Sequence, residues 1–136
     1  MADTVRRVEY RYATVPDAPG EVQKLLSTLE ERGVNLVAFL GFPEGGQSQI
    51  DLVPEDPGAL AEAAGAAGVQ LSEAKQAFLV QGDDRVGAVA DVTGKLAEAG
   101  VNVTAAAAVA AASGSFGMVV WVAPGDYEQA AGALGA

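Results

Sequence analysis

Apolar and polar residues alternate near the start of the chain and then recur at helical spacing. Val8, Tyr10 and Tyr12 are separated by charged residues, which is the two-residue period of a strand with one buried face. A turn signal follows at residues 16–20, and the next apolar residues are spaced along a helix up to Gly33, which has the place of a C-cap. These apolar residues are Val22, Leu25, Leu26 and Leu29. A strand, a turn and an amphipathic helix are therefore predicted.

The following residues have the pattern of a β-hairpin and a second helix. Residues 34–40 and 48–53 are rich in apolar residues and flank the Gly-Gly pair at residues 45–46, which is typical of a tight hairpin turn. The Asp-Pro pair at residues 56–57 begins the helix, since Asp is a preferred N-cap and Pro fits the first turn. A last strand is expected at residues 69–73. The predicted order is strand, helix, strand, strand, helix, strand.

The same pattern occurs a second time. Gly-Val-Asn-Leu at residues 33–36 recurs as Gly-Val-Asn-Val at residues 100–103, an offset of 67 residues. The offset also pairs residues of the preceding loop and helix: Asp17 with Asp84, Gly20 with Gly87, Val22 with Val89 and Leu29 with Leu96. Further along, Asp126 follows Asp56 by 70 residues, so the second copy has three more residues between these landmarks. We expect the extra residues in its hairpin.

The repeat predicts two α+β domains of βαββαβ order, residues 1–73 and residues 74–136. The sequence of the second copy ends inside its second helix, so it has no counterpart of the strand expected at residues 69–73. Residues 2–6 correspond to that strand at the offset of 67 residues, and they precede the first strand of the first copy. We expect residues 2–6 to supply the fourth strand of the second domain.

Residues 105–112 are seven alanines and one valine, a composition that favours a helix by intrinsic propensity. The repeat predicts a strand instead, because residues 105–108 align with residues 38–41 between two turn signals. A strand of such small side chains leaves free volume on its face, which suits a pocket. Close packing of a helix over that face is an equally acceptable interpretation.

Composition removes several classes of function. The 136 residues include no cysteine and no histidine, so the chain lacks disulfides, the most common metal ligands and the most common general base at neutral pH. Its net charge is −10 and its basic residues are scattered, which disfavours binding to the phosphates of nucleic acid. No run approaches the roughly 18 apolar residues of a membrane helix, and no signal peptide is recognisable. We therefore expect a cytoplasmic protein that is not an enzyme, needs no cofactor or metal, and binds neither nucleic acid nor membranes.

The loop before the first helix carries the candidate chemistry. Asp17-x-Pro19-Gly20 lies where a strand leads into a helix, so it presents unpaired N–H groups and the positive end of the helix dipole. A ligand carboxylate fits there. Asp17 could bind an ammonium group, and the amide of Asn35 could bond the same zwitterion.

Structural roles for these residues remain alternatives. The alternatives are helix caps or turn formers for Asp17 and Asp84, residues that tolerate the left-handed conformation for Asn35 and Asn102, and C-caps for Gly33 and Gly100. The recurrence of both Asp and Asn at one offset favours ligand binding, but only modestly, because common ancestry of the two copies also explains it.

At these residues the sequence resembles the ACT family of amino-acid-sensing domains. The resemblance rests on a strand, Asp-x-Pro-Gly, an amphipathic helix and Gly-Val-Asn-Leu, and the two copies cover nearly the whole chain. It implies ferredoxin-like βαββαβ units with antiparallel sheets joined edge to edge, and amino-acid effectors bound where units meet. The repeats leave no room for a catalytic domain, so the chain is similar to free-standing tandem ACT proteins.

The resemblance also implies which residues line the sites. In serine-sensing dehydrogenases of the family, an Asn before Pro-Gly and the Asn after Gly-Val contact the effector, and these positions hold Asp17 and Asn35 here, with Asp84 and Asn102 in the second copy. Asp in place of Asn changes the charge, so the identity of the effector does not carry over. The second loop lacks the proline, so the better site is expected at the first loop. The predicted ligand-binding residues are Asp17, Ala18, Pro19, Gly20, Asn35, Leu36, Asp84, Arg85, Val86, Gly87, Asn102 and Val103.

Two hypotheses of function follow. In the first, the chain is a non-catalytic regulatory homodimer that binds a small amino acid at the interface between ACT-like units and acts on a regulated enzyme or transcription regulator. In the second, it is an assembly adaptor that binds no small molecule, and its sheet edges serve assembly together with Phe116, Trp121 and Tyr127.

Overall fold

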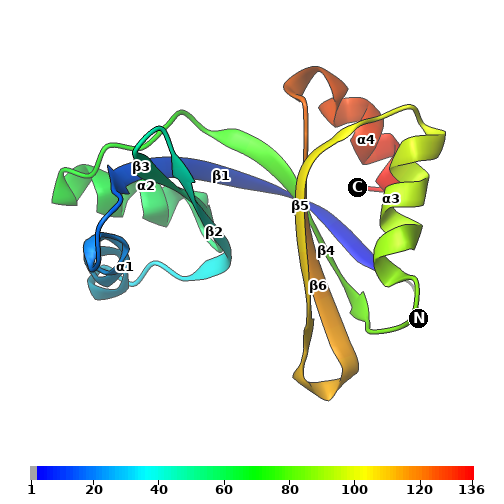
Figure 1. Cartoon of the computed structure of the whole chain (residues 1–136), viewed down its shortest axis with the longest axis horizontal. Coiled ribbons are helices and arrows are strands. Elements are labelled where there is room, and N and C mark those ends of the chain that lie inside the picture. The colour runs from blue at the N-terminus through cyan, green and yellow to red at the C-terminus, as the bar shows by residue number, and fades with distance from the viewer. Residues whose placement is uncertain (1–2) are drawn as a thin grey trace. The chain divides into compact units, whose positions relative to one another are not determined.

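Residues 3–136 are described by the computed structural model, and they form two compact units. The first-repeat unit contains residues 9–75, and the second-repeat unit contains residues 3–8 together with residues 76–136. Strand β1 (Thr4–Pro16) contributes its beginning to the second-repeat unit and its remainder to the first-repeat unit (Figure 1). Each unit is described separately below.

The first-repeat unit follows the predicted order. After β1 its elements are α1 (Glu21–Glu31), β2 (Leu36–Glu44), β3 (Gln47–Pro54) and α2 (Pro57–Ala67). Its strands are antiparallel in the order β2-β3-β1, and the two helices lie on one face of this sheet (Figure 1). The side chains buried between sheet and helices are Ala13, Leu25, Leu29, Ile50, Leu52, Leu60 and Ala63.

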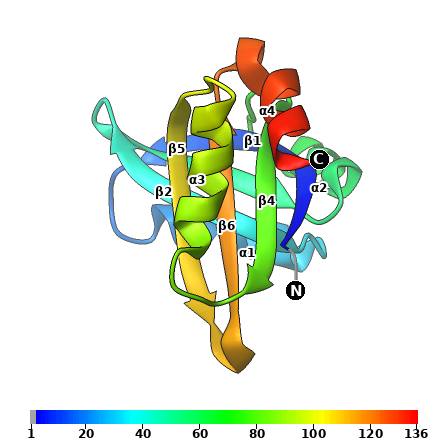
Figure 2. The ribbon, with the colours of Figure 1, turned by 90° about the vertical axis from the view of Figure 1, so that its right-hand side faces the viewer.

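The second-repeat unit has the same order of its own elements, and the beginning of β1 lies beside its first strand. Its elements are β4 (Lys75–Asp83), α3 (Ala88–Glu98), β5 (Val103–Ala111), the 3-10 turn η1 (Ala112–Gly114), β6 (Ser115–Val122), the 3-10 turn η2 (Pro124–Asp126) and α4 (Tyr127–Leu134). The strand order is β1-β4-β6-β5, and Figure 2 shows α3 and α4 over one face of β4 and β6. In the core, the ring of Tyr127 stacks on Phe78 with centroids 4.4 Å apart, and its hydroxyl donates to the carbonyl of Ala77 at 2.9 Å.

The predicted fold class is confirmed. Both units are α+β with antiparallel hairpins, both have the βαβ-βα order, and within residues 3–136 no strand follows α4. The alanine-rich residues form strand β5. The repeat predicted this strand, whereas helix propensity favoured a helix. Pairing with β6 explains the outcome, because tertiary pairing overrides the intrinsic preference of alanine.

The beginning of β1 packs into the second-repeat unit. Strand order places β1 beside β4, and the side chain of Val5 packs against the core of the second-repeat unit. Asp3 bonds Arg85, and Arg7 bonds Glu128 at 2.9 Å. Ala2, the first residue expected in this strand, lies outside the described residues.

Two expectations are wrong: the strand at residues 69–73, and the place of the three extra residues of the second copy. Residues 69–73 form no regular strand: Ser72 N–H donates to Tyr12 O at 2.8 Å, but Tyr12 N–H donates to the hydroxyl of Ser72 at 2.9 Å, so a side chain replaces the carbonyl that a ladder needs. The three extra residues of the second copy do not all lie in its hairpin. The β2–β3 turn has two residues and the β5–β6 turn has three, so only one lies there, and the other two lie between β6 and α4, where η2 forms.

Candidate functional site

The second loop, Asp84–Gly87, connects β4 to α3. Gly87 is the N-cap of α3 and has φ 87°, a left-handed conformation that strongly favours glycine. The N–H of Asp84 donates to Gly114 O at 2.8 Å, and the N–H of Ala88 donates to Arg85 O at 3.3 Å. The loop is therefore fixed by backbone bonds on both of its sides.

The first loop, Asp17–Gly20, resembles the second at its glycine. Gly20 is the N-cap of α1 with φ 86°, and the N–H of Glu21 donates to Ala18 O at 3.3 Å, the counterpart of the bond in the second loop. The proline of the first loop is thus not required for this conformation. The glycines supply it in both loops.

Asp17 and Asp84 do not cap the helices, since neither α1 nor α3 has a side-chain cap bond. The carboxylate of Asp17 accepts from the Ser48 hydroxyl at 3.3 Å. Asn35 and Asn102 do not adopt the left-handed conformation either, because Ser113 is the only non-glycine residue of positive φ among residues 3–136. Gly33 and Gly100 do end their helices in the left-handed conformation, with φ 73° and 72°, as the C-cap alternative proposed.

A hollow of about 260 Å³ lies beside the second loop. Its polar side comes from the loop and the first turn of α3, and its apolar side comes from the small side chains of β5 and from Phe116. The residues that line it are Asp84, Arg85, Gly87, Ala88, Val89, Ala90, Ala108, Val109, Ala110 and Phe116. The interpretation in which a helix packs closely over the alanines is wrong, because every residue from Thr104 to Ala111 is exposed.

Arg85 is held at the edge of this hollow. Its guanidinium donates to both carboxylate oxygens of Asp3, at 3.0 and 3.1 Å, and to the carboxylate of Asp91 at 2.9 Å. It also donates to Asp83 O at 3.1 Å and lies 5.9 Å from the ring centroid of Phe116. Hydrogen bonding to Asp3 and Asp91 raises the pKa of Arg85, and the same guanidinium lowers the pKa of Asp3. Both groups are therefore fully charged at neutral pH.

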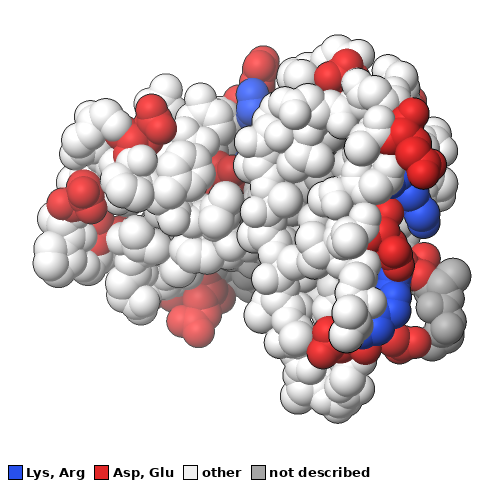
Figure 3. All heavy atoms as spheres, turned by 45° about the vertical axis from the view of Figure 1, so that its right-hand side comes forward, with Lys and Arg blue, Asp and Glu red and all other residues white. Residues whose placement is uncertain are grey.

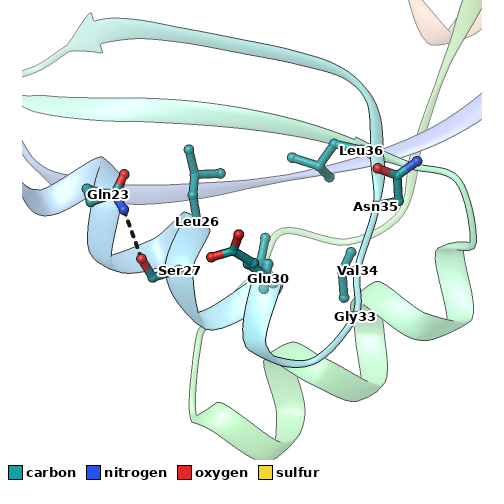
Figure 4. Close-up of a pocket in the computed structure, with 9 residues that line it drawn as sticks. Gln23, Leu26, Ser27, Glu30, Gly33, Val34, Asn35 and Leu36 are labelled. Carbon is teal, nitrogen blue, oxygen red and sulfur yellow. Dashed lines mark hydrogen bonds between the residues drawn. The ribbon is translucent and has the colours of Figure 1, made fainter.

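A second hollow, of about 520 Å³, lies in the first-repeat unit between α1 and the start of β2 (Figure 4). Asn35 and Leu36 line it with residues of α1, among which Gln23 donates to the Ser27 hydroxyl at 3.0 Å. The amide of Asn35 donates to the carboxylate of Glu55 at 2.8 Å, and the backbone N–H of Glu55 donates to Asn35 O at 2.9 Å. Asn35 is therefore tied to the end of β3.

Asp17 and Asn35 lie at opposite ends of α1. The helix has 11 residues, which is about 16 Å at 1.5 Å per residue, so one amino acid cannot touch both within one unit. The same separation by an 11-residue helix applies to Asp84 and Asn102 in the second-repeat unit. The expectation that both residues bind one zwitterion therefore requires residues of two units.

The sequence missed several residues around these hollows. Asp3 and Asp91 were not predicted as partners of Arg85, and Glu55 was not predicted as a partner of Asn35. The assignment of residues 2–6 to the second domain was the one available signal, because it brings an acidic residue beside the second loop.

Neither metal binding nor a membrane span is indicated by the described part of the chain. Residues 3–136 contain no group of three or more acidic residues placed to hold a metal ion, and no helix among them is long and apolar enough to cross a bilayer.

Comparison with known proteins identifies the fold. No family model matches the sequence, and no curated protein matches it. Among solved structures, a protein of Bacteroides thetaiotaomicron is similar with a TM-score of 0.82 and 14% identity, over 96% of this chain and 88% of that one. The ligand-free regulatory subunit of aspartate kinase from Thermus thermophilus is similar with a TM-score of 0.63 and 19% identity, over 98% of this chain and 94% of that one.

The corresponding subunit from Thermus flavus gives a TM-score of 0.57 at 20% identity, over 98% of this chain and 94% of that one. At such identities the likeness shows the fold, which is that of a pair of ACT domains, as the sequence resemblance implied. The similar aspartate kinase chains are regulatory subunits rather than catalytic ones.

Proposed function

We propose that this chain is a non-catalytic regulatory module of the cytoplasm that binds a small amino acid in the hollow beside the second loop. One observation carries the proposal: the hollow joins a carboxylate, a helix N-terminus and an apolar wall in about 260 Å³. Drug-sized ligands occupy about 300–1,000 Å³, so this hollow suits a smaller molecule. The ACT-pair fold supports the same conclusion.

Each part of a zwitterionic amino acid has a partner in this hollow. The carboxylate of Asp84 would accept from the ammonium group. The first-turn N–H groups of α3, at Val89 and Ala90, lack partners within the helix and form the positive end of its dipole, so they would bind the ligand carboxylate. The wall formed by Ala108, Ala110 and Phe116 would contact an apolar side chain.

The sequence favoured the first loop as the better site, but the hollow lies beside the second loop. The first loop, with Asp17 in the place of Asp84, is therefore proposed as a second, weaker site. The hollow beside Asn35 and Leu36, and the corresponding Asn102 and Val103, are proposed to contact a ligand held by the loop of another ACT-like unit. An effector bound where two units meet accommodates the distance between the two ends of each helix.

A second copy of the chain is the proposed cover for the hollow. β5 is the edge strand of its sheet, carries no charged side chain and is exposed along nearly its whole length. Such an edge has unpaired backbone groups that favour pairing with another strand. In a chain of net charge −10, the uncharged edge is where two copies approach with the least repulsion. A homodimer paired at β5 would place its partner against Ala108–Ala110, and the dimer would act on an enzyme or a transcription regulator.

An assembly adaptor is the alternative, but it cannot use Phe116, Trp121 and Tyr127 as the sequence suggested, because all three are buried. The large exposed apolar residues Val86, Val89 and Val109 surround the second loop and β5, with Val86 fully exposed, and they favour protein contact without a small ligand.

Isothermal titration calorimetry with each of the twenty amino acids tests the proposal. At least one should bind, and Asp84→Asn should weaken its binding by roughly tenfold or more, since a bond to a charged group contributes about 1.5–3 kcal/mol. The matched variant Asp17→Asn should have the smaller effect. No binding across the panel would favour the adaptor, for which Val109→Glu should still reduce self-association in sedimentation.

A further inference from the structure

Arg85 lies between two hollows of the second-repeat unit. One is the proposed ligand hollow. The other, of about 440 Å³, is lined by Asp3, Arg85, Ala90, Asp91, Gly94, Lys95 and Glu98. Figure 3 shows acidic and basic side chains interspersed along one border of the surface in view. Arg85 is the one side chain with a charge that lines both hollows, so a change on one side can be transmitted to the other.

Asp3 is held tightly by this arginine. The side chain of Asp3 is only 8% exposed, although the residue lies near the start of the sequence. Both of its carboxylate oxygens bond the guanidinium. A Cβ atom added at Gly82 would overlap the carboxylate of Asp3, so the glycine in β4 provides the space that Asp3 occupies. Paired bonds between a guanidinium and a carboxylate fix both position and direction.

The remainder of the N-terminal segment is anchored at alternate positions. Val5 packs into the core and Arg7 bonds Glu128 at 2.9 Å, so Asp3, Val5 and Arg7 all contact the second-repeat unit. Two of these anchors are ion pairs, and only the pair made by Asp3 involves the second loop. One guanidinium therefore links the docked N-terminal strand to the second loop.

We propose that Arg85 couples ligand binding at the second loop to the docking of residues 3–8. The ligand carboxylate, held by the N–H groups of Val89 and Ala90, also bonds the guanidinium of Arg85 and so competes with Asp3 for it. Ligand binding therefore loosens the start of β1, and release of Asp3 strengthens ligand binding. The two effects are reciprocal because they are one coupling free energy. The ligand step rests on the proposed function; the link between strand and loop does not.

Hydrogen exchange without ligand tests the link between strand and loop. Asp3→Asn should accelerate exchange of the amides of residues 4–8 and also those of the second loop. The matched variant Glu128→Gln removes the charge that pairs with Arg7, which still lies over the Tyr127 ring, and should accelerate exchange near Arg7 only. If Asp3→Asn leaves the exchange of the second-loop amides unchanged, the link between strand and loop is overturned, whether or not an amino acid binds.

Titration of the same variants with each of the twenty amino acids tests the ligand step. Asp3→Asn should bind the amino acid that the wild type binds with about fivefold or greater gain in affinity, at the low end of typical coupling. The double variant Asp3→Asn/Arg85→Gln should not show this gain in affinity. Glu128→Gln should bind the amino acid with the affinity of the wild type. Equal affinities of wild type and Asp3→Asn would overturn the ligand step. If no amino acid binds any variant, the proposed function and the ligand step both fail, and the exchange experiment alone decides the link.

Discussion

The two loops of this chain have the same conformation at their glycines and different chemistry. Gly20 and Gly87 have φ values of 86° and 87°, and each loop has the same bond from the first residue of its helix. The second residue of each loop differs, however. It is Ala18 in the first loop and Arg85 in the second, and Arg85 bonds two carboxylates. The comparison teaches that the glycine sets the conformation, while the variable position within the loop sets what the loop can bind.

The regions that follow the first helix of each repeat differ in a similar way. Asn35 bonds Glu55 by its side chain and its backbone carbonyl. The residues between β6 and α4 contain no glutamate, and they form the turn η2 instead. Ala123, the residue directly after β6, takes the place that Glu55 has after β3, and it has no carboxylate to accept a bond from Asn102.

The largest expected effects test whether the two backbones are equivalent. Gly20→Ala and Gly87→Ala should each lower the free energy of unfolding by about 1–2 kcal/mol, the cost of a left-handed conformation for a residue with a Cβ atom. Nothing lies within 4 Å of a Cβ atom added at either position, so no clash contributes. Urea unfolding measures both variants.

The control is Gly94→Ala inside α3, which should raise the free energy of unfolding by about 0.5–1 kcal/mol. A Gly87→Ala variant as stable as the wild type, beside a destabilised Gly20→Ala, would show that the loops are not equivalent.

The second helices offer a matched pair of acidic residues. Asp56 accepts from the N–H groups of Gly58 and Ala59 at 3.0 and 3.3 Å, whereas Asp126 makes no side-chain cap bond. Asp56→Ala should lower the free energy of unfolding by about 1 kcal/mol. Asp126→Ala should change it by less than about 0.5 kcal/mol. Thermal unfolding followed by circular dichroism compares them, and equal losses would contradict the assigned caps.

Proline can be moved from one loop to the other. Val86 occupies the place of Pro19 at the offset of 67 residues, directly before a glycine of the same φ. Val86→Pro should therefore raise the free energy of unfolding by about 0.4–1 kcal/mol, because it restricts the unfolded chain. Pro19→Val should have the opposite effect. Destabilisation by Val86→Pro would mean that the two backbones differ before the glycine.

The smallest effects concern two carboxyl groups, one in each unit. The Arg85 guanidinium lowers the pKa of Asp3 below its ordinary 3.8, while burial raises the pKa of Asp51. Because the pKa of Asp3 is lowered, this group stabilises the fold above pH 3.8, and the stabilisation is lost as the pH falls below that value. Because the pKa of Asp51 is raised, this group destabilises the fold at neutral pH, and the destabilisation is lost as the pH falls. At pH 7, Asp3→Asn should lower the melting temperature and Asp51→Asn should raise it, and both differences should shrink toward pH 3. Differences of the same sign would contradict the assigned shifts.

Most of the fold was accessible from the sequence because its signals are local. The hairpin glycines, the Asp-Pro start of α2 and the repeat offset each depend on neighbouring residues, and β5 was found by alignment with its counterpart. The site was accessible only in part. Asp84 and Gly87 were found as motif residues, but the hollow requires β5 beside α3, and the partnership of Arg85 with Asp3 requires two segments 82 residues apart to meet.

Ligand binding at the second loop is the central claim, and a ¹⁵N-labelled sample titrated with the twenty amino acids tests it most directly. The account predicts that at least one amino acid shifts the amide signals of the second loop, of Val89 and Ala90, and of Ala108–Ala110, with smaller shifts at the first loop. No shift with any amino acid would contradict the claim. Shifts confined to the hollow between α1 and Leu36 would contradict it equally.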